Sequence, residues 1–203
     1  MNKYFDSHFN KKVVTLYPGE YYSSSGDELI STVLGSCIAV AFFDNAKLIG
    51  GMNHFMLAYD SSAAGGANAL QGIGQFGEYS MDLIINNLLE KGSCKGNLSA
   101  KVFGGGSVLG VIPKTDMQNV VKSNIDFAFS YLKHESIPVM SSDVGGVYAR
   151  KIFYDPATSK IWLKRIVLND IEKENLFNAC LPSLKQPKKA AVAAATAGEM
   201  RLF

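Results

Sequence analysis

A cysteine on a glycine-serine turn and a histidine seventeen residues later are the residue types in this chain best suited to chemistry. Cys37 follows Gly35 and Ser36 at the start of an apolar run, and His54 lies in the next apolar segment. A cysteine attacks as its thiolate, and a nearby imidazole can take up the thiol proton. A buried cysteine is more often a small hydrophobic residue, and a buried histidine is more often structural. The pair predicts a cysteine hydrolase only if the fold brings the two side chains together.

Predicted strands on both sides of the cysteine turn supply that proximity. Residues 29–34 form an apolar run before the turn, and residues 38–43 continue as a second run that ends at an Asp-Asn pair. The chain then returns through residues 47–57, which carry His54. A β-hairpin between these two runs would place His54 beside Cys37.

The remaining elements predicted from the sequence are two amphipathic helices, several strands and connecting loops. Apolar residues recur at helical spacing from residue 76 to a stop at Gly92, and again from Asp116 to about Glu135. Serine-rich residues 21–27 and the Ser/Ala/Gly/Asn segment 60–68 are predicted to be loops. Further strands are expected at residues 13–16, 100–103 and 137–140, with a hairpin formed by 150–154 and 160–166.

Two glycine-rich segments look like nucleotide-binding loops but lack the required context. Residues 72–77 match the string GxGxxG, yet a polar loop and not a strand precedes them. Residues 104–107 do follow a predicted strand, but the Lys-Ser/Thr pair of a P-loop is missing. Tight turns or close backbone approach, which would suit the wall of a site, explain these glycines better than nucleotide binding.

Composition and charge describe an ordinary globular chain. It has 203 residues, of which 47% are hydrophobic and 19% charged, and a formal net charge of +2 without a basic arm, so nucleic-acid binding is not expected. No apolar run reaches membrane-spanning length, the first residues are unlike a signal peptide, and we expect no membrane insertion and a cytoplasmic location. The three cysteines form no CxxC pair, which argues against disulfides and structural zinc, and we expect no metal and no cofactor.

Three segments make up the expected domain organisation. Residues 1–28 supply a strand and loop that belong to the domain, and residues 29–181 form its main body. Residues 182–203 form a tail rich in proline, lysine and alanine, which is expected to be loosely ordered.

Several separate motifs, taken together, resemble those of the CheD family of chemoreceptor glutamine deamidases. They occur in the family's order and cover roughly residues 29–166, so the match is more specific than any one short pattern. The resembling stretches are STVLGSCIAV (31–40), GGMNHFML (50–57), FGEYSM (76–81), AKVFGG (100–105), Asn124-Ile125 with Phe127, and DVGG (143–146).

The resemblance implies hydrolysis of glutamine side-chain amides in the cytoplasmic helices of methyl-accepting chemoreceptors, with release of ammonia. It implies an α+β fold of layered mixed β-sheets with two main helices, similar to the catalytic domain of cytotoxic necrotizing factor. The nucleophile corresponds to Cys37 and the histidine to His54. The hydroxyl residue that orients the histidine corresponds to Ser31 or to Thr32, and the sequence leaves this choice open.

Other site residues are expected around this group. Backbone N–H groups of Ser36 and Cys37 are candidates to stabilise the tetrahedral oxyanion. The expected substrate groove consists of Asn53, Gly104, Gly105, Gly145 and Gly146.

Two other functions compete with deamidation. Resemblance to CheD also implies binding to a CheC-type phosphatase, so a non-catalytic adaptor that binds receptors or this phosphatase is the main alternative. A cysteine protease is the nearest enzymatic rival, because the same residue pair could attack a backbone amide. Neither Cys94 nor Cys180 has a histidine nearby in the sequence, and both are expected to be structural or incidental.

Overall fold

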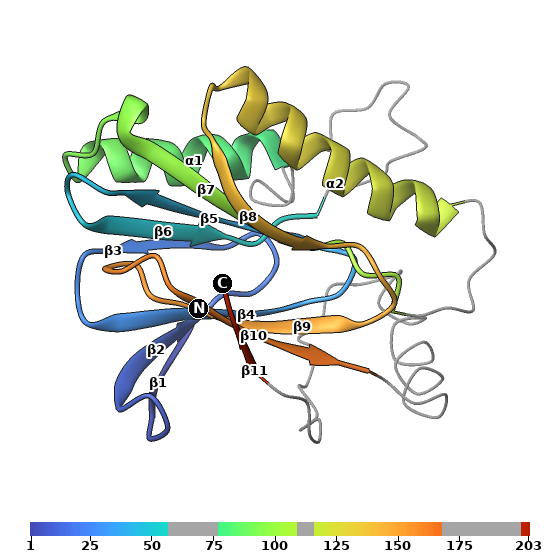
Figure 1. The fold of residues 1–203 in the computed structure, drawn as a ribbon, viewed down its shortest axis with the longest axis horizontal. Coiled ribbons are helices and arrows are strands. Elements are labelled where there is room, and N and C mark those ends of the chain that lie inside the picture. The colour runs from blue at the N-terminus through green and yellow to red at the C-terminus, as the bar shows by residue number, and fades with distance from the viewer. Residues whose placement is uncertain (57–76, 109–115, 168–199) are drawn as a thin grey trace, which may run out of the picture.

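The computed structural model describes residues 1–56, 77–108, 116–167 and 200–203. The predicted loop at 60–68, the glycine motif at 72–76, Cys180 and most of the tail lie outside the described residues. Within them, the fold has three layers, with two helices above a five-stranded sheet and a six-stranded sheet below it (Figure 1). The predicted α+β architecture of two mixed sheets and two main helices is confirmed.

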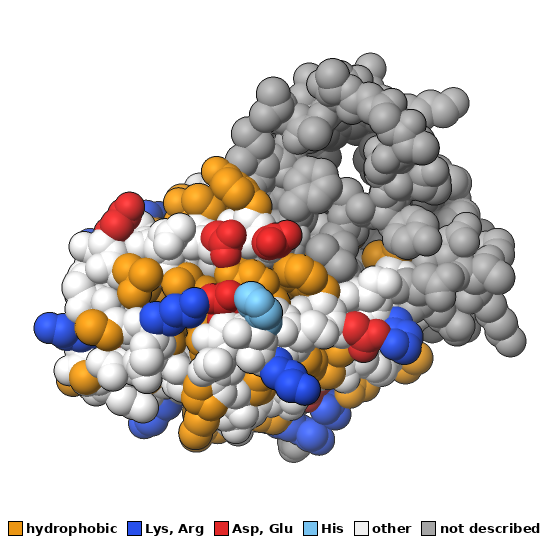
Figure 2. All heavy atoms as spheres, turned by 90° about the horizontal axis from the view of Figure 1, so that it is seen from above, with side chains coloured by type: hydrophobic (Ala, Val, Ile, Leu, Met, Phe, Trp, Pro, Cys, Tyr) orange, Lys and Arg blue, Asp and Glu red, His pale blue; other side chains and the backbone are white. Residues whose placement is uncertain are grey.

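The two helices are α1 (Gly77–Glu90) and α2 (Asp116–His134), close to the bounds predicted from apolar spacing. A short 3₁₀ turn follows α1 at Lys95–Asn97. Of the helices in the described residues, none combines the length and hydropathy needed to span a bilayer. Figure 2, which looks down on the helical side, shows acidic and basic side chains interspersed with apolar ones and not gathered into a patch of one sign.

The upper sheet has the strand order β3-β6-β5-β7-β8, and only the β7–β8 pair is parallel. The predicted hairpin of β5 and β6 is confirmed by their antiparallel pairing. The strands are β3 (Tyr21–Ser24), β5 (Ile38–Asp44), β6 (Ile49–Asn53), β7 (Leu98–Gly104) and β8 (Val139–Val144).

The lower sheet has the order β1-β2-β4-β9-β10-β11, with β2 and β4 parallel. The predicted hairpin of residues 150–154 and 160–166 is confirmed as the antiparallel pair β9–β10. The strands are β1 (Asn2–Asp6), β2 (Lys11–Thr15), β4 (Glu28–Leu34), β9 (Ala149–Tyr154), β10 (Ile161–Ile166) and β11 (Met200–Leu202).

Strand β5 is the centre of the molecule because both its faces are covered. Every residue from Ile38 to Asp44 is buried. Ile38, Val40 and Phe42 pack toward the helices, whereas Ala39 and Ala41 belong to the cluster between the two sheets. Side chains alternate along a strand, so this pattern sorts the residues beside β5 into a helix-facing set and an inter-sheet set.

One predicted loop is wrong. Residues 21–24 form strand β3, which pairs with β6 so that Ser23 lies opposite Gly51 and Ser24 opposite Gly50. A Cβ on Gly51 would come within 2.8 Å of the Ser23 Cβ, so a small residue is required there. Serine favours loops locally, but pairing of small residues across the strands makes this segment part of the sheet.

The end of the chain also differs from the expected loose tail. Residues 200–202 form β11, which pairs with β10, and Phe203 exchanges two backbone hydrogen bonds with Ile161. The Phe203 ring lies 5.9 Å from the Phe103 ring, measured between centroids. Backbone pairing and this aromatic contact explain why the last four residues join the lower sheet.

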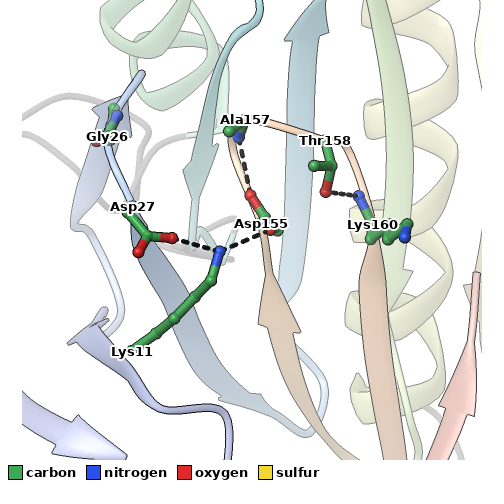
Figure 3. Close-up of polar contacts among 8 residues, drawn as sticks. Lys11, Gly26, Asp27, Asp155, Ala157, Thr158 and Lys160 are labelled. Atoms are coloured by element: carbon green, nitrogen blue, oxygen red, sulfur yellow. Dashed lines mark hydrogen bonds and ion pairs between the residues drawn. The ribbon is translucent and has the colours of Figure 1, made fainter.

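One end of the lower sheet is closed by a charged cluster. The Nζ of Lys11 lies 2.6 Å from Asp27 Oδ1 and 3.2 Å from Asp155 Oδ2, so it bridges the two carboxylates (Figure 3). Asp155 also accepts a hydrogen bond from the N–H of Ala157 in the β9–β10 turn. The cluster therefore ties the start of β2 to that turn.

Candidate active site

His54 is buried directly after β6 and is held by its backbone on one side. Its carbonyl accepts a hydrogen bond from Gly19 N (2.7 Å), and its N–H donates to Glu20 O (2.9 Å). The segment before β3 therefore pairs with His54 as a neighbouring strand would. This pairing fixes the direction of the imidazole side chain.

Pairing on the other side places His54 relative to Cys37. Ile38 and Phe55 exchange two backbone hydrogen bonds of 2.9 and 2.8 Å, in register with the β5–β6 ladder. This register puts His54 opposite Ala39, so Cys37 is its diagonal neighbour on the same face. Such diagonal neighbours lie roughly 7–8 Å apart, within reach of larger side chains. The turn and hairpin thus bring the predicted pair to one face, between the two sheets.

Thr32 approaches His54 from the other sheet. Its Oγ1 lies 2.8 Å from His54 Nδ1 and donates its own proton to Leu16 O at 2.9 Å. A hydroxyl has one proton to give, so Oγ1 must accept the proton carried by Nδ1. This hydrogen bond leaves the lone pair of the neutral imidazole on Nε2, the nitrogen that a general base would use.

Ser31, the other candidate for this position, faces the opposite way. Thr32 shares the inter-sheet face of β4 with Ile30 and Leu34, whereas Ser31 shares the outer face with Leu29. Adjacent residues of a strand point to opposite sides of the sheet. The structure therefore brings Thr32, and not Ser31, to His54.

Burial shifts the pKa of both members of the pair toward their neutral forms. It raises the pKa of the Cys37 thiol to about 11 and lowers the pKa of His54 to about 4. His54 Nε2 is buried and has no hydrogen-bond partner among the described residues. The resting site thus holds a thiol and a neutral imidazole with an unused acceptor, and not a preformed ion pair.

The glycine loop after β7 supports the cysteine turn from behind. Gly105 N donates to Cys37 O (2.8 Å), and Gly106 N donates to Gly35 O (2.7 Å). Gly104 has φ +114°, and a Cβ there would lie 2.1 Å from Cys37 O. Only glycine permits this approach, which confirms that close backbone contact explains the loop.

The N–H side of the same turn is left open. Neither Ser36 N nor Cys37 N donates a hydrogen bond to another residue within the described part of the chain. Ser36 O, by contrast, accepts a hydrogen bond from Asn124 Nδ2 at 2.9 Å. The carbonyls of the turn are therefore held, while its two N–H groups bond to no other described residue, and the Cys37 N–H interacts with its own sulfur.

The structure divides the five expected groove residues. Gly104 and Gly105 are buried behind the cysteine turn, and Asn53 is fully buried on the helix-facing side. The Asn53 amide accepts from Val40 N (3.0 Å) and donates to Met81 Sδ (3.4 Å), which accounts for it as a structural group. Gly145 is half-buried and Gly146 is exposed, so only these two reach the surface as a groove would require.

A buried charged cluster beside the site was missed by the sequence reasoning. Arg150 is fully buried and donates to Asp143 (2.7 Å) and to Gly145 O (2.6 Å), and Arg165 donates to the same carboxylate (2.5 Å). Burial alone would raise the pKa of Asp143, but the two arginines hold it below its ordinary value. Both guanidinium groups lie over the Tyr148 ring, at 4.6 Å for Arg150 and 4.4 Å for Arg165, measured to the ring centroid.

This cluster shapes the loop between β8 and β9, which in turn contacts the glycine loop. Gly145 N donates to Gly104 O (2.9 Å), and Ser107 N donates to Gly146 O (2.8 Å). The only sequence signal was the DVGG motif, because the arginines lie on strands that come later in the chain. Asn124 likewise lies in one of the resembling stretches, and the sequence assigns it no role.

Comparison with known proteins assigns the chain to a family. The family model described as CheD chemotactic sensory transduction matches residues 56–165, more than half of the chain. The chain belongs to the CheD family. The matched region begins after Cys37 and His54, but the similarity to individual relatives extends further.

Two relatives illustrate that similarity. A probable chemoreceptor glutamine deamidase CheD 1 of Shewanella oneidensis is 39% identical over 165 residues, covering 81% of this chain and 78% of the relative. A probable chemoreceptor glutamine deamidase CheD of Methylobacillus flagellatus is 36% identical over 202 residues, covering 100% of this chain and 95% of the relative. The second match therefore includes the segment that carries Cys37, Thr32 and His54.

A solved structure, the hypothetical protein YfiH of Bacillus licheniformis, resembles part of this chain. It shares 11% sequence identity at a TM-score of 0.36, covering 61% of this chain and 49% of its own. This chain thus spans about half of that protein's length, and at this score no argument rests on the likeness.

Proposed function

We propose that this protein is a glutamine deamidase that hydrolyses side-chain amides of methyl-accepting chemoreceptors in the cytoplasm. The relatives at 36–39% identity carry the name of that activity. The observation that carries the proposal is the Thr32–His54 hydrogen bond of 2.8 Å. It leaves His54 Nε2, which has no partner among the described residues, as the acceptor. A purely structural histidine would be expected to use both ring nitrogens.

In the first half of the reaction, His54 Nε2 takes the Cys37 proton as the sulfur attacks the amide carbon of the glutamine side chain. Proton transfer accompanies attack, because the resting thiol and imidazole are both neutral. The carbonyl oxygen becomes an oxyanion in the tetrahedral intermediate. Collapse breaks the C–N bond, and the imidazolium returns its proton to the leaving nitrogen, which departs as ammonia.

In the second half, water hydrolyses the thioester. His54 takes a proton from the water as its oxygen attacks the thioester carbon, and the C–S bond then breaks. The sulfur recovers the proton from the imidazolium, and the product is a glutamate side chain. Thr32 stays hydrogen-bonded to Nδ1 throughout, so that Nε2 remains the nitrogen that moves protons.

The open N–H groups of Ser36 and Cys37 receive the oxyanion in both halves. They belong to the nucleophile turn itself, and neither has an acceptor in another described residue. Donors placed where negative charge develops are typically worth about 3 kcal/mol each in barrier height. Gly145 and Gly146 form the rim of the groove, where the absence of side chains lets a receptor helix approach.

Ammonia release with mass spectrometry of the product tests the proposal. Wild-type protein mixed with the cytoplasmic fragment of its cognate chemoreceptors is expected to release ammonia and convert glutamine to glutamate. Cys37→Ala abolishes turnover, whereas Cys94→Ala, which removes an exposed thiol away from His54, retains it.

Two other outcomes would contradict deamidation. Chain cleavage without ammonia would indicate a cysteine protease. Absence of turnover on every cognate receptor, together with binding to receptors or to a CheC-type phosphatase that survives Cys37→Ala, would establish the adaptor function instead.

A further inference from the structure

We infer that Asn124 is a positioning residue whose side-chain amide aims the Cys37 N–H group at the oxyanion. The inference rests on the proposed function insofar as it assumes that Cys37 attacks a carbonyl carbon. It adds a residue from α2, more than eighty positions away in the sequence, to the supporting structure of the nucleophile.

The geometry of the peptide unit makes the connection. Ser36 C=O and Cys37 N–H belong to one planar unit, and in a trans peptide they point in opposite directions. The structure has no cis peptide bond among the described residues. Asn124 Nδ2 lies 2.9 Å from Ser36 O and holds that carbonyl toward α2. The Cys37 N–H group is thereby directed away from α2, on the side where no other described residue accepts from it.

The neighbouring peptide is held in the same way. Gly106 N donates to Gly35 O at 2.7 Å, and the N–H group of that peptide belongs to Ser36. Both open N–H groups are therefore the reverse sides of peptides whose carbonyls are fixed. The Gly106 donor is backbone and cannot be removed by changing a side chain, whereas the Asn124 donor can.

Helix α2, which carries Asn124, is packed firmly enough to hold this side chain in a fixed position. Asn124 is fully buried, and Ala128, one turn further on, belongs to the core between helices and sheet. Ile125 presses on the glycine loop, because a Cβ on Gly105 would lie 2.7 Å from Ile125 Cγ1. A donor on a rigid, packed element sets the position of its acceptor more tightly than one on a loop.

Comparing two reactions of the same thiol separates positioning of the N–H group from general support of the fold. Acylation of Cys37 by p-nitrophenyl acetate passes through a tetrahedral oxyanion, whereas alkylation by iodoacetamide displaces iodide at a saturated carbon and forms none. Both reactions require an exposed thiol and proceed through its thiolate, so a change in exposure or in the thiolate fraction affects both. Their ratio therefore reports the oxyanion donors and does not depend on any receptor.

The variants are Asn124→Ala and Asn124→Leu, in a chain whose other two cysteines are replaced by alanine. In both, the ratio of acylation to alkylation is expected to fall roughly 10- to 100-fold, a part of the loss seen when an oxyanion donor is removed entirely. Alkylation stays within about twofold of the parent, as expected if the thiol itself is unchanged. Asn124→Leu keeps the approximate shape of the side chain without a donor or a charge, so it separates the lost donor from a cavity.

Ser93→Ala is the matched control. It removes a buried hydrogen bond of 2.6 Å to Asp44, at the end of β5 remote from Cys37, and should lower the melting temperature without changing the ratio. An unchanged ratio in both Asn124 variants, or equal losses of acylation and alkylation, would overturn the inference and leave Asn124 a structural residue. Failure of the wild type to release ammonia from receptors would instead overturn the proposed function, while the ratio still tests Asn124.

Discussion

Buried polar groups lie at both ends of strand β5, but the two ends differ in whether these groups are paired. At one end, the Asp44 carboxylate accepts four hydrogen bonds, from the N–H groups of Ala46, Lys47 and Cys94 and from the Ser93 hydroxyl. Burial alone would raise the pKa of Asp44, but these donors hold it below its ordinary value. Roughly 20 Å away at the other end, His54 Nε2 and two N–H groups of the cysteine turn have no partner in another residue of the described ranges.

We interpret this difference as that between a structural polar site and a candidate active site. Leaving a buried polar atom unpaired costs about 1–3 kcal/mol, so several unpaired groups gathered around one cysteine call for an explanation. At the Asp44 end, two donors close the β5–β6 turn, and the other two tie the segment after α1 to the end of β5. The Cys37 end pairs its carbonyls and the Nδ1 of His54, and leaves open only the groups that a reacting amide would contact.

Replacing His54 by glutamine should give the largest effect. Glutamine keeps a polar side chain but has no basic nitrogen, so turnover on receptors should fall roughly 10²- to 10⁴-fold, the usual contribution of a general base. Steady-state ammonia release measures this loss, and the melting temperature should change little or rise. If His54→Gln kept more than a tenth of the wild-type rate, the Cys37 end would be no more functional than the Asp44 end.

The second prediction concerns the free energy of unfolding, which should fall as the pH is lowered. Burial lowers the pKa of His54 from an ordinary value of 6.5 to about 4, so the unfolded chain binds the proton more tightly than the folded one. Stability from the neutral imidazole is fully present above pH 6.5 and is lost as the pH falls toward 4. Between pH 7 and pH 4.5, the free energy of unfolding of wild type should drop by about 2–3 kcal/mol more than that of His54→Gln.

Urea unfolding of both proteins at a series of pH values measures this difference. The comparison cancels the titration of the carboxylates, which both proteins share. Parallel curves for the two proteins would mean that His54 is protonated as easily in the folded chain as in the unfolded one, which would contradict a neutral resting site.

Thr32→Val tests whether activity depends on the hydroxyl group that binds His54 Nδ1. Valine keeps the shape of threonine and removes the hydroxyl that fixes the Nδ1–H tautomer, so turnover should fall roughly 10- to 100-fold. Ser31→Ala, the adjacent change on the outer face of β4, should leave turnover within about twofold. Equal losses in both variants would indicate damage to β4 and not the loss of an orienting group.

The sequence alone could not decide between Ser31 and Thr32. The run 29–34 was predicted as a strand, but a strand places alternate residues on opposite faces, and only the pairing of β4 with its neighbours decides which face is inside. In the structure, parallel β2 and antiparallel β9 set that register. Strand β9 lies more than a hundred residues after the cysteine turn, and β2 is separated from β4 by strand β3.

Elements with strong local patterns could be predicted, whereas those stabilised by remote partners could not. Helix α1 and the hairpin β5–β6 follow from apolar spacing and a turn signal. Strand β1 has almost no buried side chain, and it exists through its backbone pairing with β2. Asn124 and Arg150 reach the site only after α2 and β9 have packed, so no spacing in the sequence points to them.

The smallest predicted effect lies at the Asp44 end. Ser93→Ala removes one of the four donors to a buried carboxylate, and the remaining three still hold the charge, so the cost should be about 1–2 kcal/mol in the free energy of unfolding. Turnover should stay at the wild-type level, because β5 is buried along its whole length and its Cys37 end is held separately by the glycine loop and α2. Urea unfolding and ammonia release on the same sample measure both quantities. A variant that kept its stability and lost its activity would reverse the assignment of the two ends, since it would mean that the fully paired site at Asp44 controls the open one at Cys37.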